Sequence, residues 1–154
     1  MTSSNLKTKH NNTVEMDAVE DLLETYGTLN PFLLCKKIGI TVNRAKLRNN
    51  NGLLYTDNDK KIMLINEKCD MRKSNLICAH LLGVAVLHGE VIQNFAHVLK
   101  NVYMSGDQYS ISGNRFAINL ILHDKDPKLL NKLTKNYINI VYGVHVAYYY
   151  AEAF

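Results

Sequence analysis

The chain has 154 residues, which is enough for one domain to bury a hydrophobic core without disulfides or a structural metal. Its 47% hydrophobic and 21% charged residues are typical of a soluble globular protein. No apolar run reaches the roughly 18 residues of a membrane-spanning helix, and the polar first 13 residues show no secretory signal. We therefore expect no membrane insertion and a cytoplasmic location.

The net charge of +4 comes from 18 basic and 14 acidic residues. The basic residues occur in short groups at 36–37, 44–48, 60–61, 72–73 and 125–135, a scatter typical of a solvated surface. We expect no direct nucleic-acid contact, although a basic balance leaves that alternative open. The three cysteines, Cys35, Cys69 and Cys78, form no CxxC motif, which favours a reducing compartment.

Residues 1–13 are polar and without periodicity, so we expect a disordered tail followed by a single domain over residues 14–154. Helical spacing of apolar residues predicts a first helix from Val14 to about Gly27. Asn30 and Pro31 predict the start of a second, short helix, and Gly39 its end.

Strand signals follow. Residues 40–42 are β-branched, and residues 53–56 and 61–66, separated by the turn 57–59, predict a hairpin. Long helices are expected at 71–88 and 107–122, and Pro127 breaks the chain before a final helical region. The predicted fold class is α+β, with helices packed on a small antiparallel sheet.

Residues 17–136 resemble the ImmA/IrrE type of metallopeptidase domain from phages and mobile elements. In that family one helix reads AHELGHxxLH and a later one ExxANxFAxxLL. The matching segments here are Asn51-Gly52-Leu53, Ile62-Met63-Leu64-Ile65-Asn66, Arg72, the ten residues from Ala79 to His88, and the ten from Gly113 to Leu122. The resemblance implies a zincin-like scaffold.

The departures from the family pattern fall on the residues that hold and use zinc. His80 keeps the first histidine of HExxH, but Leu81 replaces the glutamate base and Val84 the second histidine. The third ligand position falls on Ser110, and a nearby acidic position on Ser112. We therefore expect no metal, no cofactor and no catalytic residue, with His80 a packed core histidine.

Other residues could form a different site around His80. His88 lies eight residues away, about 12 Å along a helix, which is too far to share a metal ion. A rebuilt metal site could draw on residues of later segments: His97, Asp107, His123 or Asp124. Ser110 or Ser112 could pair with His80 as a nucleophile, although no orienting carboxylate is indicated.

If the scaffold remains without its chemistry, binding is the activity left. The resemblance implies a protein partner, a helix-turn-helix repressor that controls lysogeny or transfer, in the cytoplasm of a bacterial host. The alternatives are an inhibitor of a host or defence protein and an active zinc peptidase with a rebuilt site. The predicted binding surface combines Lys61 and Met63, on an expected edge strand, with the aromatic residues Tyr148, Tyr149 and Tyr150.

Overall fold

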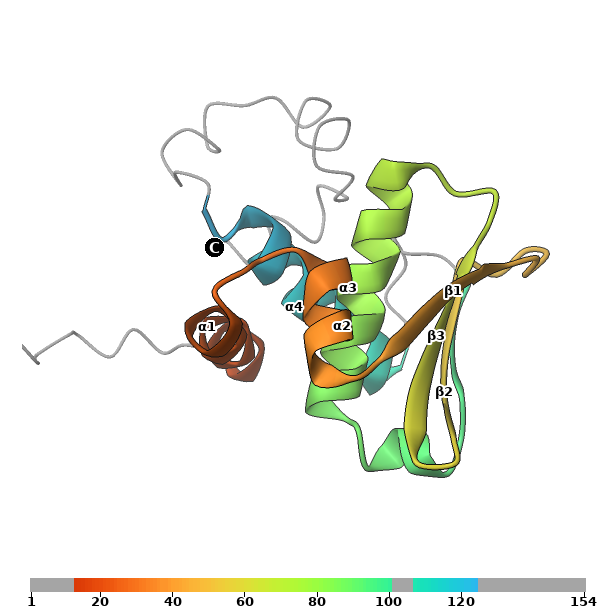
Figure 1. Ribbon diagram of the computed structural model, residues 1–154, viewed down its shortest axis with the longest axis horizontal. Helices are drawn as coiled ribbons and strands as arrows, with labels where there is room; N and C mark the ends of the chain where they lie inside the picture. The colour runs from red at the N-terminus through yellow and green to blue at the C-terminus, as the bar shows by residue number, and fades with distance from the viewer. Residues whose placement is uncertain (1–12, 101–106, 125–154) are drawn as a thin grey trace, which may run out of the picture.

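A computed structural model describes residues 13–100 and 107–124 of the chain. The helices are α1 (Val14–Tyr26), α2 (Pro31–Ile38), α3 (Met71–Leu87) and α4 (Gln108–Leu122), with a short 3-10 helix η2 (Val91–Gln93). The strands are β1 (Thr41–Ala45), β2 (Gly52–Asp57), β3 (Lys60–Asn66) and β4 (His97–Leu99). Four helices packed on one small sheet confirm the predicted α+β class (Figure 1).

The first two helices begin and end where the sequence predicts. Thr13 caps α1 by accepting a hydrogen bond from the Met16 N–H at 3.3 Å, so Thr13 is part of the domain rather than of the predicted tail. Asn30 caps α2 in the same way. Gly27 and Gly39 end the two helices with positive φ angles of 69° and 85°, a conformation that side chains with a Cβ disfavour.

The sheet has the strand order β1-β3-β2-β4. β2 and β3 form the predicted hairpin, and its two loop residues, Asn58 and Asp59, both have positive φ as a type I′ turn requires. β1 pairs with β3 in parallel, so the sheet is mixed rather than purely antiparallel. The prediction that residues 61–66 form an edge strand is wrong, because β1 occupies the free side of β3. Among the described strands, the edges are β1 and β4.

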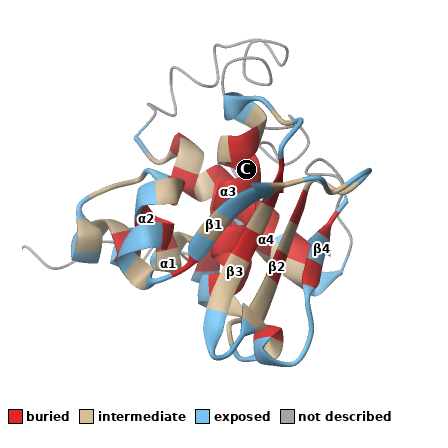
Figure 2. Ribbon diagram, turned by 45° about the vertical axis from the view of Figure 1, so that its right-hand side comes forward, coloured by how far each residue is buried: buried red, intermediate tan, exposed pale blue. Residues whose placement is uncertain are grey.

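Helix α3 lies between the sheet and α4 and is buried along most of its length (Figure 2). The close approach of α3 to α4 depends on Gly83, where a Cβ would lie 2.6 Å from Phe116. On the other side of α3, Ile77 and Leu81 lie against Gly52 of β2, where an added Cβ would meet both at 2.8 Å. The two glycines, Gly83 and Gly52, therefore set the spacing between the sheet, α3 and α4.

A pair of thiols joins α2 to α3 within the core. Cys35 and Cys78 are both fully buried, and their Sγ atoms are 3.8 Å apart as free cysteines. The hydrogen bond with Cys35, together with burial, raises the pKa of the Cys78 thiol far above its usual range.

Among the described helices, none is long and apolar enough to cross a lipid bilayer.

Candidate functional site

His80 lies at the point where α3, α4 and β4 meet. It is fully buried, and both of its ring nitrogens have partners. Nδ1 lies 2.9 Å from Oδ1 of Asn114 on α4, and Nε2 lies 3.1 Å from Nε2 of His97 on β4. The two imidazole rings are 19° from coplanar with centres 5.4 Å apart, so they approach edge to edge with their Nε2 atoms innermost.

Each member of this cluster is positioned by a local feature of the chain. Gly113 makes room for the His80 ring, because a Cβ there would lie 2.7 Å from its Cε1 atom. Asn114 matches the asparagine of the family pattern, and the structure shows it orienting the retained histidine. The pairing of His97 with Leu54 places His97 in the interior, only 4% exposed, while the next residue, Val98, points outward.

One assignment of protons satisfies both rings in their neutral state. His80 Nδ1–H donates to the Asn114 carbonyl oxygen, which leaves His80 Nε2 as an acceptor. His97 Nε2–H then donates to that nitrogen. In this assignment the two histidines are neutral imidazoles, and the Nε2 lone pair of His80 accepts a hydrogen bond from His97.

The electrostatics favour this neutral state. Burial, reinforced by the neighbouring His97, lowers the pKa of His80 to about 3, although Asn114 and Asp107 oppose the shift. Burial also lowers the pKa of His97, against the opposing charge of Asp107. Asp107 is the N-cap of α4, and the hydrogen bond from the backbone N–H of Ser110 is the main cause of its own lowered pKa. Both histidines are therefore uncharged at neutral pH.

The positions that correspond to the peptidase machinery are apolar or occupied by a small hydroxyl. Leu81 and Val84 are fully buried, and Ser110 is 8% exposed in the first turn of α4. Neither Ser110 nor Ser112 hydrogen-bonds to His80 within the described part of the chain, so no serine–histidine pair forms there.

The described residues offer fewer than the three ligands that a zinc ion of the peptidase kind needs at this site. Residues 13–100 and 107–124 contain no group of three or more His, Cys, Asp or Glu side chains that could hold a metal ion. A catalytic zinc site needs three protein ligands and an open position for water. The two histidines that could contribute, His80 and His97, instead satisfy one another.

The remaining candidate ligands are dispersed. His88 packs edge-on against Tyr109, and its Nε2 atom is buried without a hydrogen-bond partner among the described residues. His123, at the far end of α4, bonds to Glu20 of α1. It is nine residues, or about 14 Å of helix, beyond Asn114, and Asp124 follows it. Of the later candidates, the structure brings His97 to His80 directly and Asp107 within electrostatic reach.

Of the predicted binding residues, the structure describes Lys61 and Met63. Met63 is fully buried in the inner strand β3, so its side chain cannot meet a partner. Lys61 lies on the same strand near the hairpin and is half-buried. Tyr148, Tyr149 and Tyr150 lie outside the described residues.

Sequence reasoning missed β4, whose three residues are too few to show an alternating pattern.

A helix carrying a buried histidine, held by an asparagine of the facing helix and packed on a small mixed sheet, defines a metallopeptidase-like domain. The IrrE N-terminal-like domain family matches residues 35–151, so the chain belongs to that family. One relative, "Uncharacterized immunity region protein 2" of Bacillus phage phi105, is 32% identical over 70% of this chain and 67% of its own length. Another, "Metallopeptidase ImmA" of Bacillus subtilis (strain 168), is 31% identical over 70% of this chain and 62% of its own length.

Proposed function

We propose that this chain is a non-catalytic member of its family that acts by binding a protein, a helix-turn-helix repressor of a phage or mobile element. The observation that carries the proposal is the pairing of His80 with His97 as neutral, buried imidazoles. The single histidine kept from the zinc-binding motif is thereby engaged by the protein itself. The immunity-region and ImmA names of the relatives support the choice of a phage repressor as partner.

The residues around His80 also support a non-catalytic role, because they stabilise the domain without a metal ion. A general base and zinc ligands buried without their metal are costly, because desolvated charges need a counter-charge. Leu81 and Val84 instead extend the apolar surface of α3 and are fully buried. The domain can therefore fold on its apolar core without energy from a metal ion.

We propose the β4 edge of the sheet as the place where the protein partner binds. In the described part of the chain no strand pairs with the outer side of β4. Val98 is 43% exposed on this strand, and Phe95, 48% exposed, packs 5.8 Å from the Tyr109 ring. A strand edge flanked by exposed apolar side chains suits an extended segment of a partner, with backbone hydrogen bonds providing affinity.

The test is capture of a phage helix-turn-helix repressor by this chain, followed by intact-mass measurement of the captured repressor. A complex containing full-length repressor is the expected result. Val98→Glu should weaken capture at least tenfold, because it puts a charge at the proposed contact. Leu33→Glu, at a similarly exposed position on α2, is the matched control and should bind normally. Repressor fragments, or equal loss in both variants, would contradict the proposal.

A rebuilt zinc peptidase is the second candidate, favoured by the approach of His97 to His80. Two imidazole nitrogens bonded to one tetrahedral zinc at about 2.0–2.1 Å lie roughly 3.3 Å apart, close to the 3.1 Å observed here. Such a site would also need a third ligand, which the described residues do not offer. Stoichiometric zinc that disappears in His97→Ala would favour this candidate over the first.

A further inference from the structure

Two segments that are distant in sequence lie side by side at one end of the sheet. Residues 44–48 are the end of β1 and the residues after it, and residues 67–73 are the link from β3 and the first turn of α3. The Glu67 N–H donates to the Ala45 carbonyl at 2.9 Å, and Arg44 Nη1 donates to the Cys69 carbonyl at 3.3 Å. The Asn66 side chain also donates to the Arg48 carbonyl at 3.1 Å. These bonds fix the two segments as one surface, which we call the basic end.

The basic end carries the net charge of the whole chain. Its six basic residues are Arg44, Lys46, Arg48, Lys68, Arg72 and Lys73, and its two acidic residues are Glu67 and Asp70. The resulting +4 equals the net charge of the protein, so the other residues are neutral in sum. Five of the six are exposed, with Lys73 half-buried, and none forms an ion pair with a described residue. Basic groups at 44–48 and 72–73, which are separate in the sequence, therefore share one surface.

Three of these residues stand where the local backbone disfavours them. Arg72 and Lys73 stand in the first turn of α3, which has no acidic residue, although the helix dipole disfavours cations at that end. Arg48 adopts a left-handed φ of 54°, a conformation uncommon outside glycine and asparagine. The fold tolerates these charges rather than gaining stability from them, which points to a role in binding.

The chemistry of the surface distinguishes between kinds of partner. The twelve residues of the basic end include no aromatic side chain, and Met71 is its one large exposed apolar residue. Protein interfaces are enriched in aromatic residues and depleted in lysine at their centres. Single-stranded nucleic acids are bound by stacking their bases on aromatic rings. A surface that offers exposed guanidinium and ammonium groups without aromatic rings suits contact with the phosphates of a duplex.

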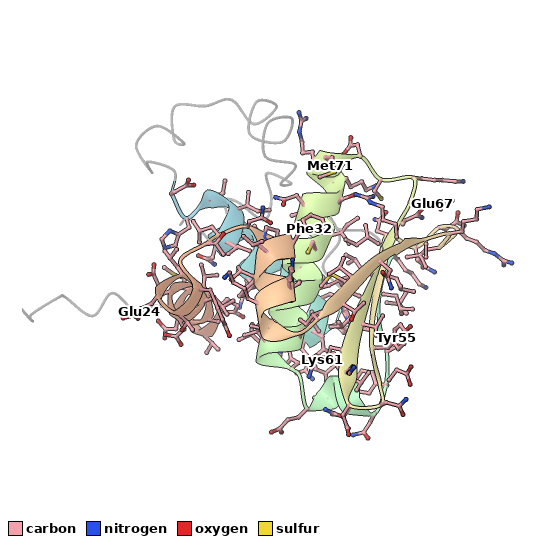
Figure 3. All side chains as sticks on the ribbon, viewed as in Figure 1. Glu24, Phe32, Tyr55, Lys61, Glu67 and Met71 are labelled. Carbon is pink, nitrogen blue, oxygen red and sulfur yellow. The ribbon has the colours of Figure 1, made fainter. Side chains whose placement is uncertain are left out.

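We propose that the basic end binds the phosphate backbone of duplex DNA without sequence preference. The basic end and the surface assigned to the protein partner are different faces, because β1 and β4 are opposite edges of the sheet. Asn51 lies between them, since it contacts Cys69 of the basic end and donates from its backbone N–H to the Leu99 carbonyl of β4. Figure 3 shows Glu67 and Met71 at the end of the molecule away from Lys61 and the hairpin. A protein bound at β4 and a DNA backbone at the basic end can therefore be held together, as a DNA-bound repressor would require.

The experiment measures binding of the full chain to a fluorescein-labelled duplex of arbitrary sequence by anisotropy, at salt concentrations from 50 to 200 mM. The test variant K46Q/K68Q/R72Q removes three exposed charges from the basic end. The control K36Q/K37Q/K60Q removes three exposed charges from α2 and the hairpin. Circular dichroism checks that both variants fold.

Six phosphate contacts predict that wild-type affinity falls roughly 10³-fold across this salt range, and three contacts predict about 40-fold. The test variant should show the shallower dependence and weaker binding at every salt concentration, whereas the control should follow the wild type. Equal weakening of both variants would overturn the proposal, as would no binding at 50 mM. Salt-sensitive self-association in place of DNA binding would also overturn it, and would assign the basic end to the five acidic residues of α1 in a second copy.

Discussion

Acidification should destabilise this protein well above the pH at which carboxylates titrate, and His80 is the main reason. Its pKa is 6.5 when exposed and about 3 in the folded chain, so the folded state favours the neutral ring. The unfolded chain therefore takes up a proton that the folded chain refuses. The stabilisation is complete above pH 6.5 and is lost as the pH falls towards 3.

For His80 alone, the free energy of unfolding should drop by about 2 kcal/mol between pH 7.5 and pH 5. His97 adds to this loss, because burial lowers its pKa in the same direction. Asp107 does not contribute within this range, because its pKa is already lowered from a usual value of 3.8. The combined loss from His80 and His97 is a large part of the free energy of unfolding of a domain of this size.

The measurement is urea unfolding, followed by circular dichroism at several pH values, for the wild type, His80→Gln and His123→Gln. Glutamine preserves much of the volume and hydrogen bonding at position 80 but does not titrate, so the drop should shrink by about 2 kcal/mol. His123→Gln removes the histidine that bonds to Glu20, outside the buried pair, and shows how a histidine change elsewhere affects the same measurement. Identical pH dependence in the wild type and His80→Gln would refute the assignment of a buried neutral imidazole.

Three further predictions concern the same cluster. Gly113→Ala should destabilise the domain by about 1–3 kcal/mol in urea unfolding, because its Cβ would press on the His80 ring; helix propensity alone predicts a gain, so a more stable variant would mean that the ring lies elsewhere. Elemental analysis of the purified chain should find no stoichiometric zinc, and a chelator should leave Tm unchanged; one zinc per chain would contradict this. The triple change Leu81→Glu, Val84→His and Ser110→Glu should bind zinc in calorimetry and lower metal-free stability by more than about 2 kcal/mol, because two fully buried apolar positions become polar. A folded triple variant without zinc affinity would show that these positions do not converge.

The helices and the hairpin could be predicted because their signals are local. Asn30 acts through its side-chain cap, and Gly39, Asn58 and Asp59 act through their positive φ angles. Each stands where the sequence places it. The order of the strands is not local. β1 joins β3 across the intervening hairpin, so a strand that looks like an edge in sequence becomes an inner strand.

The candidate site was only half predictable for a similar reason. His80 and the apolar replacements at Leu81 and Val84 follow from the motif and its spacing. His97 comes from a three-residue strand that exists because β2 offers it a pairing edge, and no periodicity marks it in the sequence. The basic end arises in the same way, because residues 44–48 and 67–73 meet only through the parallel pairing of β1 with β3.

The buried thiols that join α2 to α3 provide a reporter of local opening within the protein. Cys35 and Cys78 are inaccessible in the folded state, and the raised pKa of Cys78 leaves it without the thiolate that reacts with alkylating agents. Cys69 is partly exposed and marks the end of the loop before α3. The rate at which the second and third thiols become labelled therefore measures how often α2 separates from α3, without any added probe.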